Sequence, residues 1–162
     1  MTLFAVLKLL HVVSAMWLVS GLLGRAVALS AARRAPEMRI LKAIADVSGR
    51  LENLMIAPGI FAVVGTGIAA AFAGGFSLLG PFGDGPLWLF IPLALMTFAI
   101  VMTPITLRHD REWGMALEDA ARQGTVTDRL RGFLDGRAML RRYAPDITFV
   151  VIIVVLMVLK PF

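Results

Sequence analysis

Cysteine is absent from this chain of 162 residues, which also has only two histidines and one tyrosine. The absence of cysteine excludes disulfide bonds, thiolate metal sites, a cysteine nucleophile and covalent attachment of a c-type haem. Charged residues are scarce too, at 17% of the chain against 59% for apolar residues. Soluble proteins carry about 25% charged residues. The composition therefore indicates an integral membrane protein.

Common catalytic and nucleotide-binding motifs are also missing. The sequence has no dinucleotide fingerprint, no nucleophile elbow, no His-Glu-x-x-His helix and no carboxylate cluster. We therefore assign no catalytic residue. The net charge is +5, but the basic residues flank apolar segments, as in membrane proteins, so no nucleic-acid partner is expected.

Four apolar segments are long enough to predict helices that cross a membrane. They lie at about residues 3–32, 52–73, 87–107 and 144–160. Pro58, Pro92 and Pro104 predict bends in the second and third segments. The last segment is rich in valine and isoleucine and also fits a buried strand, but beside three other spans a helix is expected. The predicted fold is all-α, a four-helix transmembrane bundle forming one domain over residues 1–162.

The first segment has a cation at each end of its apolar core, Lys8 and Arg25. The core is about 24 Å long, shorter than the roughly 30 Å of hydrocarbon, so both cations are expected to snorkel to the interfaces. A secretory signal cleaved near Ala28-Leu-Ser30 is the alternative. Arg25 and the arginine pair after the core favour a retained helix.

The basic residues predict the orientation. The connections 33–50 and 108–142, counted with Arg25, hold all the basic residues except Lys8 and Lys160. By the positive-inside rule both connections lie in the cytoplasm and both termini lie outside. We expect the connections to form amphipathic helical extensions on the cytoplasmic side.

Sequence signals within the two connections predict the extension helices. In the first, apolar residues at helical spacing predict a helix that lies at the interface and leads into the second span. These residues are Ile40, Ile44, Val47, Leu51 and Leu54. In the second, a helix over about 110–122 is expected to end at Gly124. A hydroxyl cap at Thr125 or Thr127 begins the next helix. Asp146 is expected in the first turn of the last span.

Two features predict the packing of the first two spans. Gly65 and Gly67 allow close approach of the helices. Arg25 and Glu52 both belong at the cytoplasmic rim of antiparallel spans, so the sequence allows an ion pair between them.

His11 is the sharpest functional signal, because an ionisable residue inside a span is a functional candidate. Imidazole is an axial ligand of b-type haem and a ligand of copper. The alternative is a structural histidine bonded to a neighbouring helix. His109 lies at the opposite, cytoplasmic end of the third span, so the two histidines are not expected to share one haem iron. Methionines in or near the spans form no sequence cluster and are expected to pack as apolar side chains. They are Met16, Met55, Met96, Met102 and Met157.

The pattern Lys8-x-x-His11, followed by Trp17 and Gly21, resembles the opening helix of a bacterial family of four-helix predicted integral membrane proteins, a domain of unknown function. The first helix is also similar to those of HemJ-type protoporphyrinogen oxidases and copper-resistance D membrane domains. The HemJ resemblance implies His11 as haem ligand, with Lys8 and Arg25 near propionates or substrate carboxylates. The chain departs from that pattern in having no second histidine soon after Arg25.

These observations lead to one main expectation and two alternatives. We expect a multi-pass protein of the bacterial inner membrane, a binding or accessory subunit whose partners are the lipid bilayer and other membrane subunits or a second copy. The first alternative is a b-haem oxidoreductase with His11, Lys8 and Arg25 as cofactor-binding residues. The second is a copper-handling protein with His11 as metal ligand.

Overall fold

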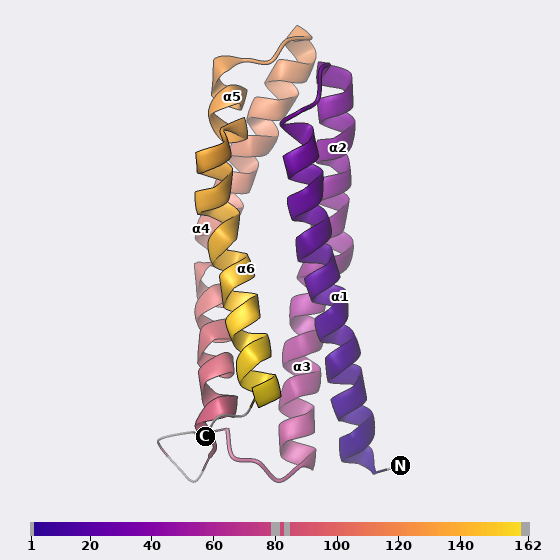
Figure 1. Ribbon diagram of the computed structural model, residues 1–162, viewed down its shortest axis with the longest axis vertical. Helices are drawn as coiled ribbons and strands as arrows, with labels where there is room; N and C mark the ends of the chain where they lie inside the picture. Colours follow the sequence, from indigo (N-terminus) through magenta and orange to yellow (C-terminus); the bar gives the residue numbers. More distant parts are fainter. Residues whose placement is uncertain (1, 79–81, 83–84, 160–162) are drawn as a thin grey trace.

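The computed structural model describes residues 2–78, 82 and 85–159, without the side chains of 103–107, 109 and 137–143. This part of the chain is all-helical and contains no strand. Its elements, labelled in Figure 1, are α1 (Leu3–Ala32), α2 (Met38–Leu51), the π-helical turn η1 (Glu52–Ile56), α3 (Ala57–Ala73), α4 (Leu87–Gln123), α5 (Asp128–Leu134) and α6 (Gly136–Leu159).

The long helices run side by side as two groups (Figure 1). In one group α1 packs along α2, η1 and α3, and in the other α4 packs along α6. The short α5 contacts α4 and α6 at the end of the molecule away from the N-terminus. The helices form an elongated bundle.

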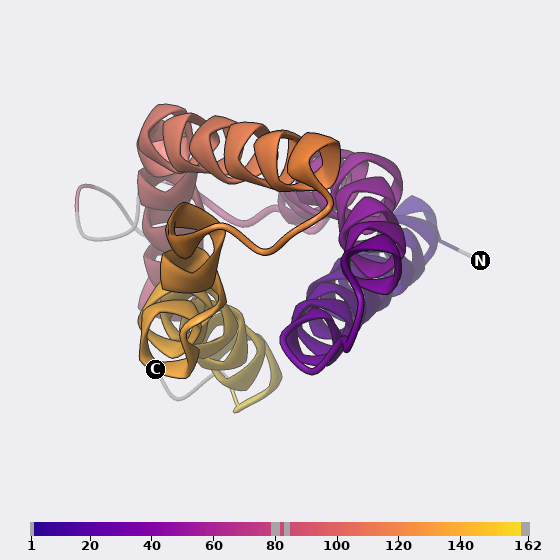
Figure 2. The same cartoon turned by 90° about the horizontal axis from the view of Figure 1, so that it is seen from above.

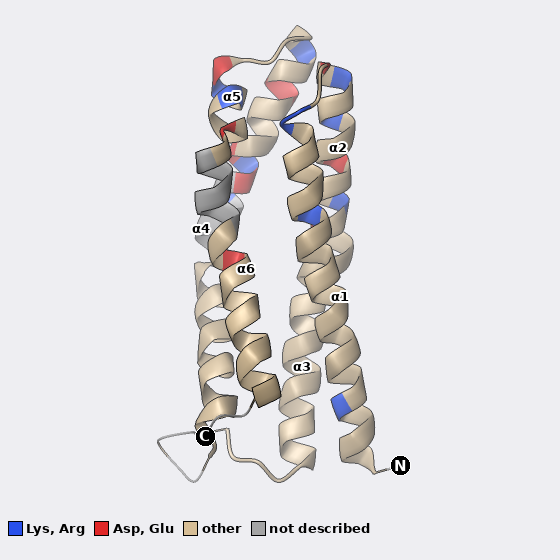
Figure 3. Cartoon of the chain, in the orientation of Figure 1, with Lys and Arg blue, Asp and Glu red and all other residues tan. Residues whose placement is uncertain are grey.

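Charge divides the molecule along its length. Figure 3 shows the charged residues gathered over α2, α5 and the second half of α4, whereas the other half is almost uncharged. The uncharged half of the molecule exposes large apolar side chains, among them Phe61 at 75%, Phe72 at 69% and Val158 at 73%. Such a continuous apolar surface is typical of contact with a membrane.

Within the described residues, two helices are long and apolar enough to cross a membrane, α1 and the continuous helix Met38–Ala73. α4 and α6 carry the shorter apolar stretches Leu87–Met102 and Ala144–Leu159. All four segments predicted to be helical are therefore helical as far as the structure describes them. Lys160, the predicted end of the last span, lies outside the described residues.

α2 continues into α3 as one helix of 36 residues. The join is the π turn η1, where the Ala57 N–H donates to the Glu52 carbonyl five residues back. Pro58 follows directly and has no N–H to donate, so a wider turn at this point accommodates the proline within a continuous helix. The predicted link to the second span is confirmed.

The buried face of α2 does not coincide with the apolar residues that predicted this helix. Ile40 and Val47 are 41% and 50% exposed, whereas Leu41, Ala45 and Ser48 are buried. Small side chains on that face allow close approach, and they pack against α4 and α5 in a compact apolar cluster. The cluster consists of Leu41, Ala45, Ala116, Leu117, Ala120 and Leu130.

The second connection, 108–142, is shorter than expected at both ends, because α4 extends into it and α6 begins within it. The helix expected over 110–122 is the second half of α4, which ends at Gly124 as predicted, with φ of 68°. Thr127 caps α5, since its Oγ1 accepts from the Leu130 N–H at 3.3 Å. α6 begins at Gly136, so Asp146 lies in the interior of this helix and not in its first turn.

α4 changes direction between its halves. Figure 2 shows its first half nearly end-on and its second half running across toward α2. Pro92 and Pro104 both lie within this helix, and a proline removes one backbone hydrogen bond. The change of direction fits the predicted bend, and it brings the charged half of α4 to the first helix group.

Candidate functional site

His11 lies on α1 and faces α3. Its Nδ1 is 2.9 Å from the carbonyl oxygen of Val63. A carbonyl can only accept, so Nδ1 is the donor, and in the neutral ring Nε2 carries the free lone pair. Nε2 has no hydrogen-bond partner among the described residues. The ring is thus held by one nitrogen, while the other remains available to a ligand.

Gly67 of α3 explains in part how the His11 ring can lie so close to this helix. A Cβ added to Gly67 would lie 2.9 Å from Cε1 of His11, so only glycine leaves room for the ring. Gly65, which was also expected at the helix contact, has nothing within 4 Å of such a Cβ. The prediction is confirmed for Gly67 and wrong for Gly65, which is on the exposed side of the helix.

A cavity of about 340 Å³ at the charged end is separate from a larger one of about 480 Å³ beside His11. The larger cavity is walled by α1, α3, α4 and α6. Its described lining is apolar except for His11 and Ser20. The Ser20 hydroxyl donates to the Met16 carbonyl of its own helix at 2.8 Å. Ser20 can still accept a hydrogen bond, but His11 is the described side chain of this lining with a ring nitrogen that makes no hydrogen bond.

Three methionines line this cavity together with His11. They are Met16 on α1, Met96 on α4 and Met157 on α6. Nothing in the sequence indicates this grouping, because the three residues lie in three different helices. Thioethers suit Cu(I), and one can also serve as an axial haem ligand. No group of three or more His, Asp or Glu side chains in the described part of the chain is placed to hold a metal ion.

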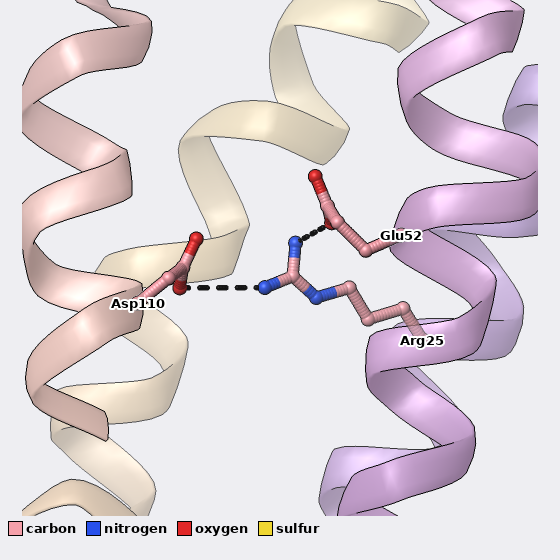
Figure 4. A network of polar contacts seen from close by, with 3 residues as sticks. All are labelled: Arg25, Glu52 and Asp110. Carbon is pink, nitrogen blue, oxygen red and sulfur yellow. Dashed lines mark hydrogen bonds and ion pairs between the residues drawn. The ribbon is translucent and has the colours of Figure 1, made fainter. Parts of the chain in front are cut away.

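A second polar arrangement joins the two helix groups near the charged half. Figure 4 shows Arg25 of α1 between Glu52 of η1 and Asp110 of α4. Arg25 Nη1 donates to Glu52 Oε2, and Arg25 Nη2 lies 3.4 Å from Asp110 Oδ1. The Arg25 side chain is 16% exposed. The Arg25–Glu52 pair agrees with the sequence interpretation, but Asp110 was missed, because only the fold shows that α4 passes this point.

The structure places the predicted cofactor-binding residues apart along α1. Lys8 is exposed, one turn before His11, and is not among the described residues that line the cavity. Arg25 lies 14 residues after His11, or about 21 Å along the helix. The side chain of His109 lies outside the described residues, but its neighbour Asp110 contacts Arg25. His109 is thus at the level of Arg25 and far from His11.

The comparisons with curated proteins and with solved structures gave no match. One family, described as "Predicted integral membrane protein (DUF2269)", matches residues 5–161. The match includes nearly all of α1, with His11 and Arg25. It confirms the resemblance to a family of unknown function, and the chain therefore belongs to the DUF2269 family of predicted integral membrane proteins.

Proposed function

We propose that this is a multi-pass protein of the bacterial inner membrane in which α1, α3, α4 and α6 each cross the bilayer. The uncharged half in Figure 3 supports this arrangement. The apolar stretches of α4 and α6 have 16 residues each, or about 24 Å. Basic residues concentrate in the other half, which favours a cytoplasmic position for α2 and α5 and an outside position for both termini.

Within that membrane domain, the cavity beside His11 is the proposed functional site. Its volume of about 480 Å³ falls in the range of about 300–1,000 Å³ that is usual for small-molecule pockets. The hydrogen bond from Nδ1 to Val63 orients the ring. We infer a binding or accessory subunit that holds a ligand against His11, in a complex with other membrane subunits or a second copy. This oriented histidine in an apolar cavity is the observation that carries the proposal.

A metal-bound ligand is the second candidate. Histidines that bind metals usually donate their other ring N–H to a carbonyl or carboxylate, as His11 does. The resemblance to HemJ-type proteins favours haem b with His11 as axial ligand, and the exposed Lys8 would meet a propionate only where it reaches the surface outside the cavity. The three methionines at the cavity favour Cu(I) instead.

One set of measurements separates these candidates. The protein is purified in mild detergent from cells supplied with haem and copper, as wild type and His11→Ala. Visible spectra of the oxidised and dithionite-reduced protein report haem, elemental analysis reports copper, and mass spectrometry of an organic extract reports other ligands. A ligand present in the wild type and lost in His11→Ala supports the proposal. Equal ligand content in both proteins contradicts the role of His11.

A further inference from the structure

The cavity beside His11 opens on the side of the molecule. Four of its apolar lining residues have well-exposed side chains. These are Val12 at 47% and Met16 at 65% on α1, and Val154 at 43% and Val158 at 73% on α6. The opening thus lies between α1 and α6, within the uncharged half of the molecule (Figure 3). In a membrane this side faces the lipid, so a ligand arriving through the opening must be soluble in lipid.

The polar group of that ligand must suit His11. Because Nδ1 donates to Val63, Nε2 of the neutral ring can only accept a hydrogen bond. A hydroxyl group donates such a bond, whereas an ether or a ketone does not. The chemistry of the ring therefore selects a ligand that donates a hydrogen bond, and a hydroxyl group is one such donor.

The cavity also selects against charge. No Lys, Arg, Asp or Glu is among the described residues that line it. Burying a carboxylate or phosphate without a cation is strongly unfavourable. Lys8, one turn before His11, is exposed and is not among the described residues that line the cavity. Arg25, the buried cation of this helix, lies about 21 Å away along α1 and is engaged with Glu52 and Asp110. A neutral headgroup fits the wall, and an anionic one does not.

We propose that the cavity binds a neutral lipophilic molecule with a hydroxyl group, of which a hydroquinone with an alkyl chain is an example. The molecule enters from the bilayer between α1 and α6, and its hydroxyl donates to Nε2 of His11. This inference rests on the proposed binding function and names the chemical class of the ligand.

Three related probes test the ligand class with the whole protein in lipid nanodiscs. They are decylhydroquinone, its dimethyl ether and dodecanoate, and affinity is measured by native mass spectrometry. We expect decylhydroquinone to bind about tenfold more tightly than the ether, because the ether leaves Nε2 without a donor. Dodecanoate is expected to bind more weakly than decylhydroquinone. In His11→Ala the affinity for decylhydroquinone should fall to that for the ether, with the affinity for the ether unchanged.

The outcomes separate the inference from the proposed function. Equal binding of decylhydroquinone and its ether, or tighter binding of dodecanoate, overturns the ligand class but leaves a binding cavity. Haem or copper that is lost in His11→Ala, with no probe bound, also overturns the class and leaves the binding function. Absence of any bound probe, haem, copper or extracted ligand overturns both.

Two adjacent valines of α6 test the route of access. Val154 lines the cavity and is 43% exposed, and Val155 does not line it and is 46% exposed. Val154→Trp should obstruct the opening and slow the uptake of decylhydroquinone, whereas Val155→Trp is the matched control and should leave uptake unchanged. Equal rates in the two variants overturn access between α1 and α6.

Discussion

His11 of α1 fits against Gly67 of α3 with no room for a further carbon. A Cβ on Gly67 would lie 2.9 Å from Cε1 and 3.1 Å from Nδ1 of the ring. The same ring nitrogen is 2.9 Å from the carbonyl of Val63 on the preceding turn of α3. The glycine therefore sets the position from which His11 donates its hydrogen bond.

Gly67→Ala is expected to displace His11 from Val63. Alanine in a helix gains about 0.5–1 kcal/mol over glycine, but the overlap with the ring is expected to cost about 1–3 kcal/mol. We expect a net loss of thermal stability in detergent and weaker binding of decylhydroquinone. Thermal unfolding and native mass spectrometry measure the two effects.

Gly65→Ala is the matched control for this substitution. It lies two residues away on the same helix, with open space around the added Cβ. We expect it to keep ligand affinity and to be as stable as the wild type or more so. Equal losses in the two variants would contradict a specific role for the His11–Gly67 contact.

The sequence predicted the helices but not which residues of α2 are buried. Apolar length identified the four segments, and Gly124 and Thr127 marked helix ends correctly. The apolar spacing of 40–54 predicted that α2 is a helix, but it did not predict which of its residues are buried against α4 and α5. In this protein small residues such as Ala45 are buried and Val47 is exposed, a pattern seen where helices pack closely.

The candidate site was predicted only in part. His11 was identified from its own chemistry, since a lone ionisable residue in a span is visible in one helix. The cavity wall was not predictable, because Met16, Met96 and Met157 meet only through the packing of three helices. Asp110 was missed for the same reason: α4 was expected to end before it.

Arg25→Ala is expected to destabilise the protein by about 2–3 kcal/mol, because it leaves two partly buried carboxylates without their shared cation. Arg25 is 16% exposed, and its partners Glu52 and Asp110 are 35% and 30% exposed. The free energy of unfolding in detergent is the measurement. In Arg25→Ala/Asp110→Asn the loss should be smaller than the sum of the two single losses, since the pair is already broken.

An exposed pair provides the control for this network. Arg131 and Asp128 on α5 lie 3.8 Å apart, and the Arg131 side chain is 71% exposed. Arg131→Ala should leave the unfolding transition unchanged, as expected for surface ion pairs. If Arg25→Ala behaves like Arg131→Ala, the network does not join the two helix groups.

Gly21→Ala is expected to separate α1 from the helix that contains η1. Its Cβ would lie 2.8 Å from Cβ of Met55, a distance that requires the backbones to move. We expect a loss of about 1–3 kcal/mol in unfolding free energy. Gly49→Ala on α2 has open space around its Cβ and should gain stability through helix propensity. A stable Gly21→Ala protein would contradict the close approach of these helices.

The proposed topology predicts opposite results for two fusions of alkaline phosphatase, an enzyme that folds only outside the cytoplasm. A fusion after Phe162 should be active, because both termini are proposed to lie outside. A fusion after Gly124 should be inactive, because Gly124 ends α4 just before α5, which is proposed to be cytoplasmic. Expression of each fusion is checked by immunoblot, so that a degraded protein is not read as an inactive one. Activity after Gly124, or none after an intact Phe162 fusion, would show that the orientation or the number of spans is wrong.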